Sequence, residues 1–299
     1  MKTNTLTLLA AVAFTFAATA NAQQNFAAAQ INAVDLGRDT FMLEGLGGNI
    51  TLAAGKDGAI MVDGQFAPMH EKIKAAVLAL TGVPVKYLVN THYHGDHTGG
   101  NAAFAAIGTI TVAHENVGKR IAAGTTNSFT GAKTAPAAKE MIPKRAYTKD
   151  LTLSVRGRVA RVGHPANAHT DGDSYVYFAD ANVLATGDIV TLGRYPLVDF
   201  GNGGSIAGLI AAVDSFIKIS NDKTKVVPGH GPVVDKKALV NYRTVLTTAR
   251  DRVAKLVAEG KSVQQAVEAK PFPDLDKQTG ANQQQSDVFV RGIYASLKL

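Results

Sequence analysis

The sequence predicts an α+β fold in which two β-sheets lie face to face and helices cover both outer sides. Short apolar runs of β type occur in two groups, one before residue 123 and one after residue 147, and helical patterns lie between and after them. Apolar residues make up 46% and charged residues 18% of the 299 residues, as in an ordinary globular protein with a substantial core.

The first 22 residues have the pattern of a cleavable export signal. Lys2 is followed by an apolar run over residues 6–18 and by Ala20-Asn21-Ala22, an A-x-A cleavage site. We expect cleavage after Ala22 and a mature periplasmic chain that starts at Gln23. The sequence has no Cys for a lipid anchor and no later apolar run long enough to span a membrane, so we expect no membrane anchor after cleavage.

The first group of β-type runs alternates with helices. Glycines separate the early runs in the manner of hairpins. The expected strands cover residues 41–44, 49–53, 59–62, 85–89 and 109–113. The expected helices cover residues 69–80, 101–107 and 115–122.

Residues 123–147 have no clear period and are rich in Gly, Thr, Ser, Pro and Lys. Two interpretations remain open for this segment: a surface excursion, or a flap over the functional site.

The second group of β-type runs leads into a helical C-terminal part. The expected strands cover residues 151–155, 159–162, 174–178, 183–186 and 225–227. The expected helices cover residues 206–217 and 236–259, one that starts with a capping box at 262–265, and a terminal one over 289–297. We therefore expect one domain over residues 23–299, with a helical extension from about residue 236.

Residues 91–97 contain four metal-ligating side chains at the end of an expected buried strand. His92 and His94 are two apart, so they can point the same way while the backbone is still extended. Gly95 permits a sharp turn, which lets Asp96 and His97 aim at a different point. Two pairs with two directions indicate two metal ions.

Three further candidate ligands lie in loops at the ends of later apolar runs: His169, Asp188 and His230. Such loops are where sheet folds gather their site residues. His164 lies close to His169 in the sequence and remains an alternative for its role. With no Cys in the chain, a metal site has to use imidazole and carboxylate groups, and no disulfide can form.

The formal net charge of +7 is a mild basic excess that favours an anionic small-molecule substrate. The basic residues are scattered and form no block with interleaved aromatic residues, so we do not expect nucleic acid as a partner. The sequence does not predict the oligomeric state.

The order of these ligands resembles the metallo-β-lactamase superfamily, over about residues 41–232. The resemblance implies a four-layer αββα sandwich and two metal sites bridged by Asp188. It assigns His92, His94 and His169 to one metal. It assigns Asp96, His97 and His230 to the other, and it implies that Asp63 orients a ligating histidine.

The donor set suits two Zn²⁺ ions per chain, and also Fe²⁺ or Mn²⁺. The resemblance implies that a metal-bound hydroxide attacks a cyclic amide or ester. Such a hydroxide is available at neutral pH because a metal lowers the pKa of bound water to about 7. Asp96 is the expected catalytic residue, orienting the hydroxide.

Asp188 departs from the pattern of the drug-resistance β-lactamases, which have Cys or Ser at this position. A bridging Asp is similar to that of lactonases and thioesterases, whereas residues 169–178 and 187–205 resemble exported metallo-hydrolases. We expect a periplasmic, β-lactamase-like hydrolase that acts on β-lactams. The alternatives are a lactonase or thioesterase of the same fold, a mononuclear-iron sulfur oxidoreductase, and a non-catalytic metal- or cofactor-binding protein.

The expected substrate contacts lie after Asp188. Tyr195 and Asn202 are candidates for binding an oxyanion or carboxylate. Gly203, Gly204 and Ser205 open a helix, where free N–H groups can bind an anion, although a simple helix cap explains the same pattern.

Overall fold

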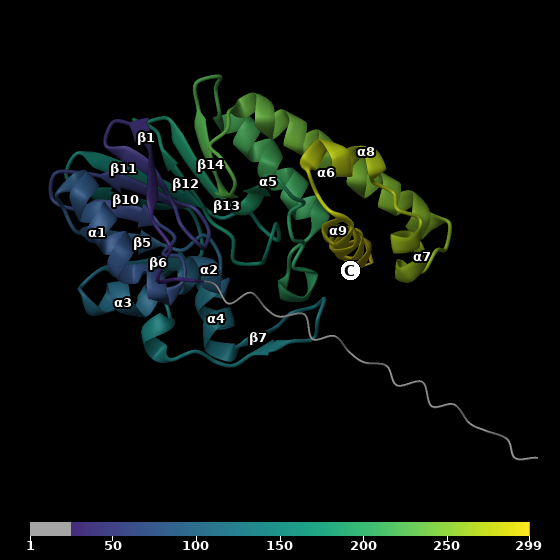
Figure 1. Cartoon of the computed structure of the whole chain (residues 1–299), viewed down its shortest axis with the longest axis horizontal. Coiled ribbons are helices and arrows are strands. Elements are labelled where there is room, and N and C mark those ends of the chain that lie inside the picture. Colours follow the sequence, from purple (N-terminus) through teal and green to yellow (C-terminus); the bar gives the residue numbers. More distant parts are fainter. Residues whose placement is uncertain (1–24, 299) are drawn as a thin grey trace, which may run out of the picture.

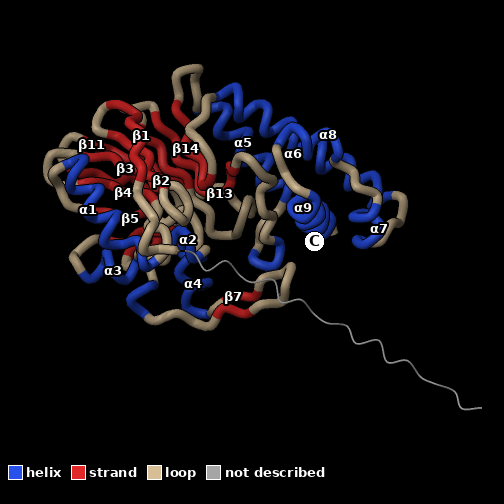
Figure 2. Tube along the Cα trace, in the orientation of Figure 1, coloured by secondary structure: helices blue, strands red, loops and turns tan. Residues whose placement is uncertain are grey.

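The computed structural model describes residues 25–298, and the predicted signal segment 1–22 lies outside the described residues. Two β-sheets pack face to face, and helices cover both outer sides (Figures 1 and 2). The predicted four-layer αββα sandwich is confirmed.

Within the described residues the first sheet has seven strands, in the order β1-β2-β3-β4-β5-β6-β9. Their bounds are β1 (Asn32–Gly37), β2 (Thr40–Glu44), β3 (Ile50–Ala54), β4 (Ala59–Val62), β5 (Val85–Val89), β6 (Ile110–His114) and β9 (Arg145–Tyr147). The strands β1 to β4 pair antiparallel, while β4, β5, β6 and β9 pair parallel, so the ends of β4 and β5 meet at one edge.

The second sheet has five strands in the described part of the chain, in the order β10-β11-β12-β13-β14. Their bounds are β10 (Leu151–Val155), β11 (Arg158–Gly163), β12 (Tyr175–Phe178), β13 (Val183–Thr191) and β14 (Lys225–His230). All neighbours are antiparallel except β13 and β14, which run parallel. A separate small hairpin consists of β7 (Thr125–Thr126) and β8 (Lys133–Thr134).

Helices form the two outer layers. On the side of the first sheet these are α1 (His70–Thr81), α2 (Gly95–Thr98), α3 (Asn101–Ala106) and α4 (Glu115–Ala123). On the side of the second sheet they are α5 (Ile206–Ile219), α6 (Lys236–Ala258), α7 (Val263–Glu268), α8 (Pro273–Thr279) and α9 (Gln283–Ser296). Among the described residues no helix combines the length and apolar character that crossing a membrane requires.

The β4 strand shows why the early apolar runs are continuous rather than alternating. Ile60 and Val62 face the core between the sheets, whereas Ala59 and Met61 face the core beneath α1. Both faces are covered, so every residue of the strand is buried.

The structure adds elements that the sequence patterns did not predict, namely β1, α2, the β7–β8 hairpin, β9 and α8. The hairpin and β9 lie in the segment 123–147, which has no apolar period because most of its residues are exposed. These strands form by backbone pairing with neighbours, which leaves little trace in the side-chain pattern.

Candidate metal centre

The loop after β5 brings four predicted ligands to the edge of the sandwich. His94 has an extended backbone and forms the N-cap of α2, which carries Asp96 and His97 in its single turn. The change from extended chain to helix at Gly95 therefore separates the two pairs, as the sequence predicted.

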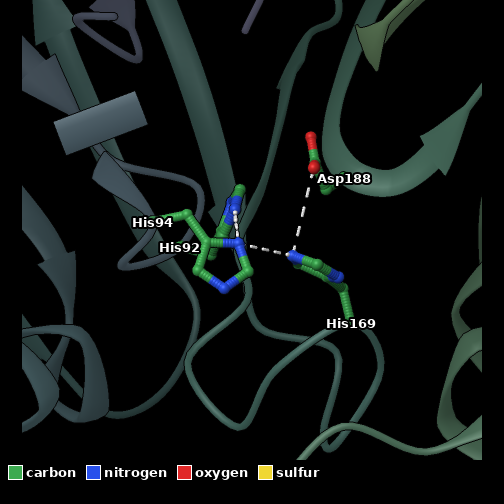
Figure 3. Close-up of side chains that lie close together, drawn as sticks. All are labelled: His92, His94, His169 and Asp188. Atoms are coloured by element: carbon green, nitrogen blue, oxygen red, sulfur yellow. Dashed lines mark hydrogen bonds and ion pairs between the residues drawn. The ribbon is translucent and has the colours of Figure 1, made fainter. Parts of the chain in front are cut away.

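The first group of candidate ligands consists of His92, His94, His169 and Asp188, whose donor atoms all lie within 4.8 Å of one another (Figure 3). His94 Nδ1 lies 3.0 Å from His92 Nε2 and 3.1 Å from His169 Nε2. The Oδ2 atom of Asp188 lies 4.0 Å from His169 Nε2. Three imidazole nitrogens and one carboxylate thus converge on one point.

The second group consists of Asp96, His97 and His230. Asp96 Oδ2 lies 3.6 Å from His97 Nε2 and 3.2 Å from His230 Nε2. The other oxygen of Asp188, Oδ1, lies 3.2 Å from His97 Nε2 and 3.5 Å from His230 Nε2. The two carboxylate oxygens of Asp188 therefore face the two groups, which is the arrangement a bridging ligand needs.

The chemistry of the site fits bound divalent cations. Within the described residues, His97 Nε2 and Asp188 Oδ1 are buried and, although they lie 3.2 Å apart, form no hydrogen bond with each other or with another group. A buried polar atom without a partner is destabilising, and a metal ion would satisfy both atoms at once. Imidazole and carboxylate ligands suit Zn²⁺, Fe²⁺ or Mn²⁺.

Burial favours the neutral imidazole at two ligands of the first group, His92 and His169. Burial and the neighbouring His94 lower the pKa of His169 to about 4, and burial and His97 hold the pKa of His92 well below its usual range. Neutral imidazole is the form that binds a metal.

In the second group the nearby carboxylates determine the protonation of His97. Burial opposes the charged form of His97, but the carboxylates of Asp188 and Asp63 outweigh it and raise the pKa of His97 well above its usual value. A bound cation would have to displace that proton, which makes metal binding at this group sensitive to pH.

Asp63 fixes the ligand loop from the end of β4. Its carboxylate accepts hydrogen bonds of 2.7 Å from both the Thr91 backbone N–H and the Thr91 hydroxyl, and lies 2.8 Å from His97 Nδ1. Its backbone has a φ of 66°, an uncommon conformation that Asp tolerates better than most residues. The sequence predicted this residue as the partner of a ligating histidine, and the structure places it in contact with His97.

His169 is held by a residue that the sequence analysis missed. Asp173 accepts hydrogen bonds of 2.6 Å and 2.9 Å from the backbone N–H groups of His169 and Thr170. Burial raises the pKa of Asp173 to about 7. The only available signal was its place four residues after His169 in a Gly-containing turn. The ring is oriented separately, by a 2.8 Å hydrogen bond from His169 Nδ1 to the Leu197 carbonyl.

Asp199 is a second residue that the sequence analysis missed. Its Oδ2 lies 3.2 Å from His94 Nε2, the ring nitrogen that faces away from the ligand cluster, and it also accepts a hydrogen bond from the Tyr93 hydroxyl. Asn202 donates to it at 2.8 Å. Asn202 was expected to contact substrate, but its amide instead holds Asp199 and its carbonyl accepts from Arg120.

The alternative ligand His164 lies outside both groups. Its ring stacks on His114 with a centroid distance of 3.7 Å, and its Nδ1 lies 2.7 Å from the Asp173 carbonyl oxygen. The structure therefore brings His169, rather than His164, to the ligand cluster.

Asp188 and His230 lie within strands rather than after them, which corrects the expected strand ends at 186 and 227. β13 continues to Thr191, and its register with β14 shifts around Gly187. Gly187 has a φ of 52°, and a side chain there would clash with Thr91. This irregularity turns the carboxylate of Asp188 toward the histidines while the strand continues.

The other expected substrate residues are engaged elsewhere. Tyr195 is buried against Phe289, and its hydroxyl donates to Asp276 of α8 at 2.8 Å. The N–H groups of Gly203, Gly204 and Ser205 donate to the carbonyls of Phe200, Asp199 and Ala168, respectively. Ser205 also caps α5 through its hydroxyl. These groups are therefore not free to bind a substrate anion, and the cap interpretation is the one that the geometry supports.

Comparisons with known proteins place this chain and its fold in one family. The profile of the metallo-beta-lactamase superfamily matches residues 43–230, more than half of the chain. The structure is similar to a metallo-beta-lactamase from Pontibacter korlensis, with a TM-score of 0.57 and 20% identity over 73% of this chain and 99% of that one. It is also similar to the metallo-beta-lactamase FIM-1 from Pseudomonas aeruginosa, with a TM-score of 0.59 and 16% identity over 74% of this chain and 96% of that one.

One sequence relative is named for an activity that differs from that of the two β-lactamases. The chain is 48% identical to a hydroxyacylglutathione hydrolase from Polaromonas sp. (strain JS666 / ATCC BAA-500) over 54 residues, which are 18% of this chain and 20% of that enzyme. The match thus spans about a fifth of that relative's length.

The fold and the paired His/Asp groups define a metal-dependent hydrolase. The chain belongs to the metallo-β-lactamase superfamily.

Proposed function

We propose that this chain is an exported hydrolase that binds two Zn²⁺ ions and opens cyclic amides, with β-lactams as its substrates. The observation that carries the two-metal part of the proposal is Asp188, whose two oxygens face two separate groups of ligand atoms. The choice of β-lactams rests on the resemblance of residues 169–178 and 187–205 to exported metallo-hydrolases. The periplasmic location rests on the sequence pattern of residues 1–22 alone.

When bound, a pair of Zn²⁺ ions supplies an activated water at neutral pH and stabilises negative charge on the substrate carbonyl and the leaving group. The chain's own contribution is to hold the ligands and to place an orienting group. Asp96 serves as that group, as a hydrogen-bond acceptor that orients the attacking water. Burial opposes its ionisation, but His230 and His97 outweigh burial and lower its pKa to about 2, so it is ionised at neutral pH.

The side chain of Asp96 is also within reach of solvent, with 27% of its surface exposed, whereas His97 beside it is fully buried. An ionised, partly exposed carboxylate can accept a hydrogen bond from the attacking water and orient it. Asp96 therefore has two roles, ligand and orienting group.

Thioester or lactone hydrolysis is the second candidate. It is favoured by the carboxylate at position 188 and by the partial match to a hydroxyacylglutathione hydrolase. A mononuclear-iron oxidoreductase is less well supported, because it would leave Asp96, His97 and His230 without a ligand role although they lie together.

One substrate panel tests the proposal. Purified mature protein is assayed at equal concentrations of a penicillin, a cephalosporin, a carbapenem, an acyl-homoserine lactone and an acyl-glutathione thioester, with and without a chelator. We expect modest β-lactam hydrolysis that is lost on chelation and restored by Zn²⁺. If a lactone or thioester exceeds every β-lactam by about 100-fold in kcat/KM, roughly 2.7 kcal/mol of transition-state preference, the named substrate is wrong. Hydrolysis that continues at the same rate in the presence of the chelator would contradict the metal-dependent mechanism itself.

A further inference from the structure

We propose that the cavity between His94 and the segment 124–142 is a pocket for an apolar acyl or aryl substituent of the substrate. The inference rests on the proposed function and narrows its substrate class to molecules that carry such a group beside the scissile bond.

The position of the cavity connects it with the metal centre. His94 and its partner Asp199 form one side, and Phe129 and Met141 form the other. His94 is a member of the first ligand group and also lines the cavity, so the cavity adjoins that group on the side of the ring where Asp199 lies. The volume is about 260 Å³. This is below the range of about 300–1,000 Å³ that holds a whole drug-sized ligand, and it suits one substituent.

The cavity walls favour an apolar occupant. Ile121, Phe129, Ala137, Met141 and Leu197 contribute apolar surface.

The main polar side chains of the cavity are already paired within the protein. Tyr93 donates its hydroxyl to Asp199, and the Arg120 guanidinium bonds Asp171 at 2.7 Å and Asn202 at 3.1 Å. A polar substituent would compete with these bonds, whereas an apolar one would leave them intact.

The outer wall is braced against the rest of the molecule. Phe129 packs edge-on against Phe200, with ring centroids 5.3 Å apart. The tip of the Phe129 ring also lies against Gly292 of α9, at an ordinary contact distance of 3.6 Å from where a Cβ would be. The Ala137 N–H donates to the Ile121 carbonyl at 3.0 Å. Figure 1 shows the β7–β8 hairpin reaching toward α9. These contacts form the cavity before any substrate binds.

The test is a homologous series of substrates on one nucleus. Zinc-loaded protein is assayed with 6-acylamino-penicillins that carry acetyl, butanoyl, hexanoyl and octanoyl side chains, and with the matching acyl-homoserine lactones and thioesters. Burial of each methylene should raise kcat/KM about fourfold until the cavity is full. A flat series would overturn the pocket and leave the proposed function intact.

Variants locate the effect. Ala137→Phe places a ring in the cavity and should reduce the octanoyl-to-acetyl ratio of kcat/KM to near one, whereas Met141→Ala enlarges the cavity and should favour the octanoyl member. Ala138→Phe is the matched control, because Ala138 is the next residue, is also exposed and does not line the cavity. Equal ratios in all three variants and the unaltered protein would overturn the proposal.

If none of the three substrate series is hydrolysed, the proposed function is wrong, and a binding measurement then tests the pocket independently. Metal-free protein is titrated with octanamide and acetamide, followed by NMR chemical shifts. Octanamide binding at least about tenfold tighter than acetamide, and weakened by Ala137→Phe, supports the pocket. Equal affinities contradict it.

Discussion

The ligand cluster and the apolar pocket lie side by side and share His94, yet they are built in opposite ways. The ligands are mostly buried and fixed by polar side chains, such as Asp63 beneath Thr91 and His97. The outer wall of the pocket comes from residues 125–142, which are largely exposed and are held by a few apolar contacts. We infer that the ligand cluster determines the reaction and that the pocket wall determines which substrate is preferred. Substitutions in one region should therefore leave the property of the other region unchanged.

Removal of Asp188 should have the largest effect, because among the described residues it is the one whose carboxylate faces both ligand groups. We expect Asp188→Ala to lower metal affinity and activity together, each by at least about 100-fold. Substitution of residues that only support the ligands already lowers metal affinity or activity by about 10–100-fold. Metal content and kcat/KM measured on the same sample check this. In Asp188→Cys, which offers a softer ligand, metal should be retained and substrate preference altered. Full metal content with unchanged turnover in Asp188→Ala would show that the bridging role is wrong.

Asp63→Ala should rank second. It removes the acceptor for the Thr91 N–H and for His97 Nδ1, both of them buried. We expect metal affinity to fall by about 10–100-fold without a change in the chain-length preference of the pocket. Competition with a chromophoric chelator measures the affinity. Asp222→Ala at an exposed site is the control. A variant that keeps its metal affinity but changes its substrate preference would break the proposed separation.

Asp199→Asn should have a smaller effect, of about tenfold in metal affinity. The amide can still accept from Tyr93 or His94, but it lacks the negative charge that favours a metal-bound imidazole. Because Asp199 also borders the pocket, this variant tests where the two regions are coupled. An unchanged metal affinity, measured by the same chelator competition, would mean that Asp199 serves the pocket alone.

The smallest effect concerns the stacked pair His114 and His164 next to Asp173. Burial and His164 lower the pKa of His114 to about 4. Between pH 6.5 and pH 4 the unfolded chain therefore binds more protons at this residue than the folded chain, so acid favours unfolding.

We expect His114→Gln to remove roughly 2 kcal/mol of the stability loss between pH 7 and pH 5, measured by urea unfolding at the two values. An identical pH dependence in the two proteins would contradict the assignment. Activity at neutral pH should change little, because His114 lies outside both ligand groups.

The ligand cluster could be predicted from the sequence because its chemistry is local. His92, His94, Asp96 and His97 lie within one turn-forming loop, and His169, Asp188 and His230 are among few strong ligands at the ends of apolar runs. The sandwich followed from the same runs.

The pocket could not be predicted in this way. Its walls come from α4, the segment 124–142 and the stretch around Leu197, which meet only in the folded chain. Asp199 and the actual partners of Asn202 were equally hidden, since these contacts join residues to Tyr93 and Arg120 about 80 to 105 positions away in sequence. At Ser205 the sequence pattern left open a helix cap and an anion-binding turn, and the contacts of the folded chain favour the cap.

The most direct test of the account is the metal content of the protein purified without chelator, measured by elemental analysis against amino-acid-quantified protein. The account predicts two Zn²⁺ per chain, falling to well below one in Asp188→Ala. One iron per chain, or two zinc ions that persist in Asp188→Ala, would contradict the claim that one carboxylate joins two metal sites.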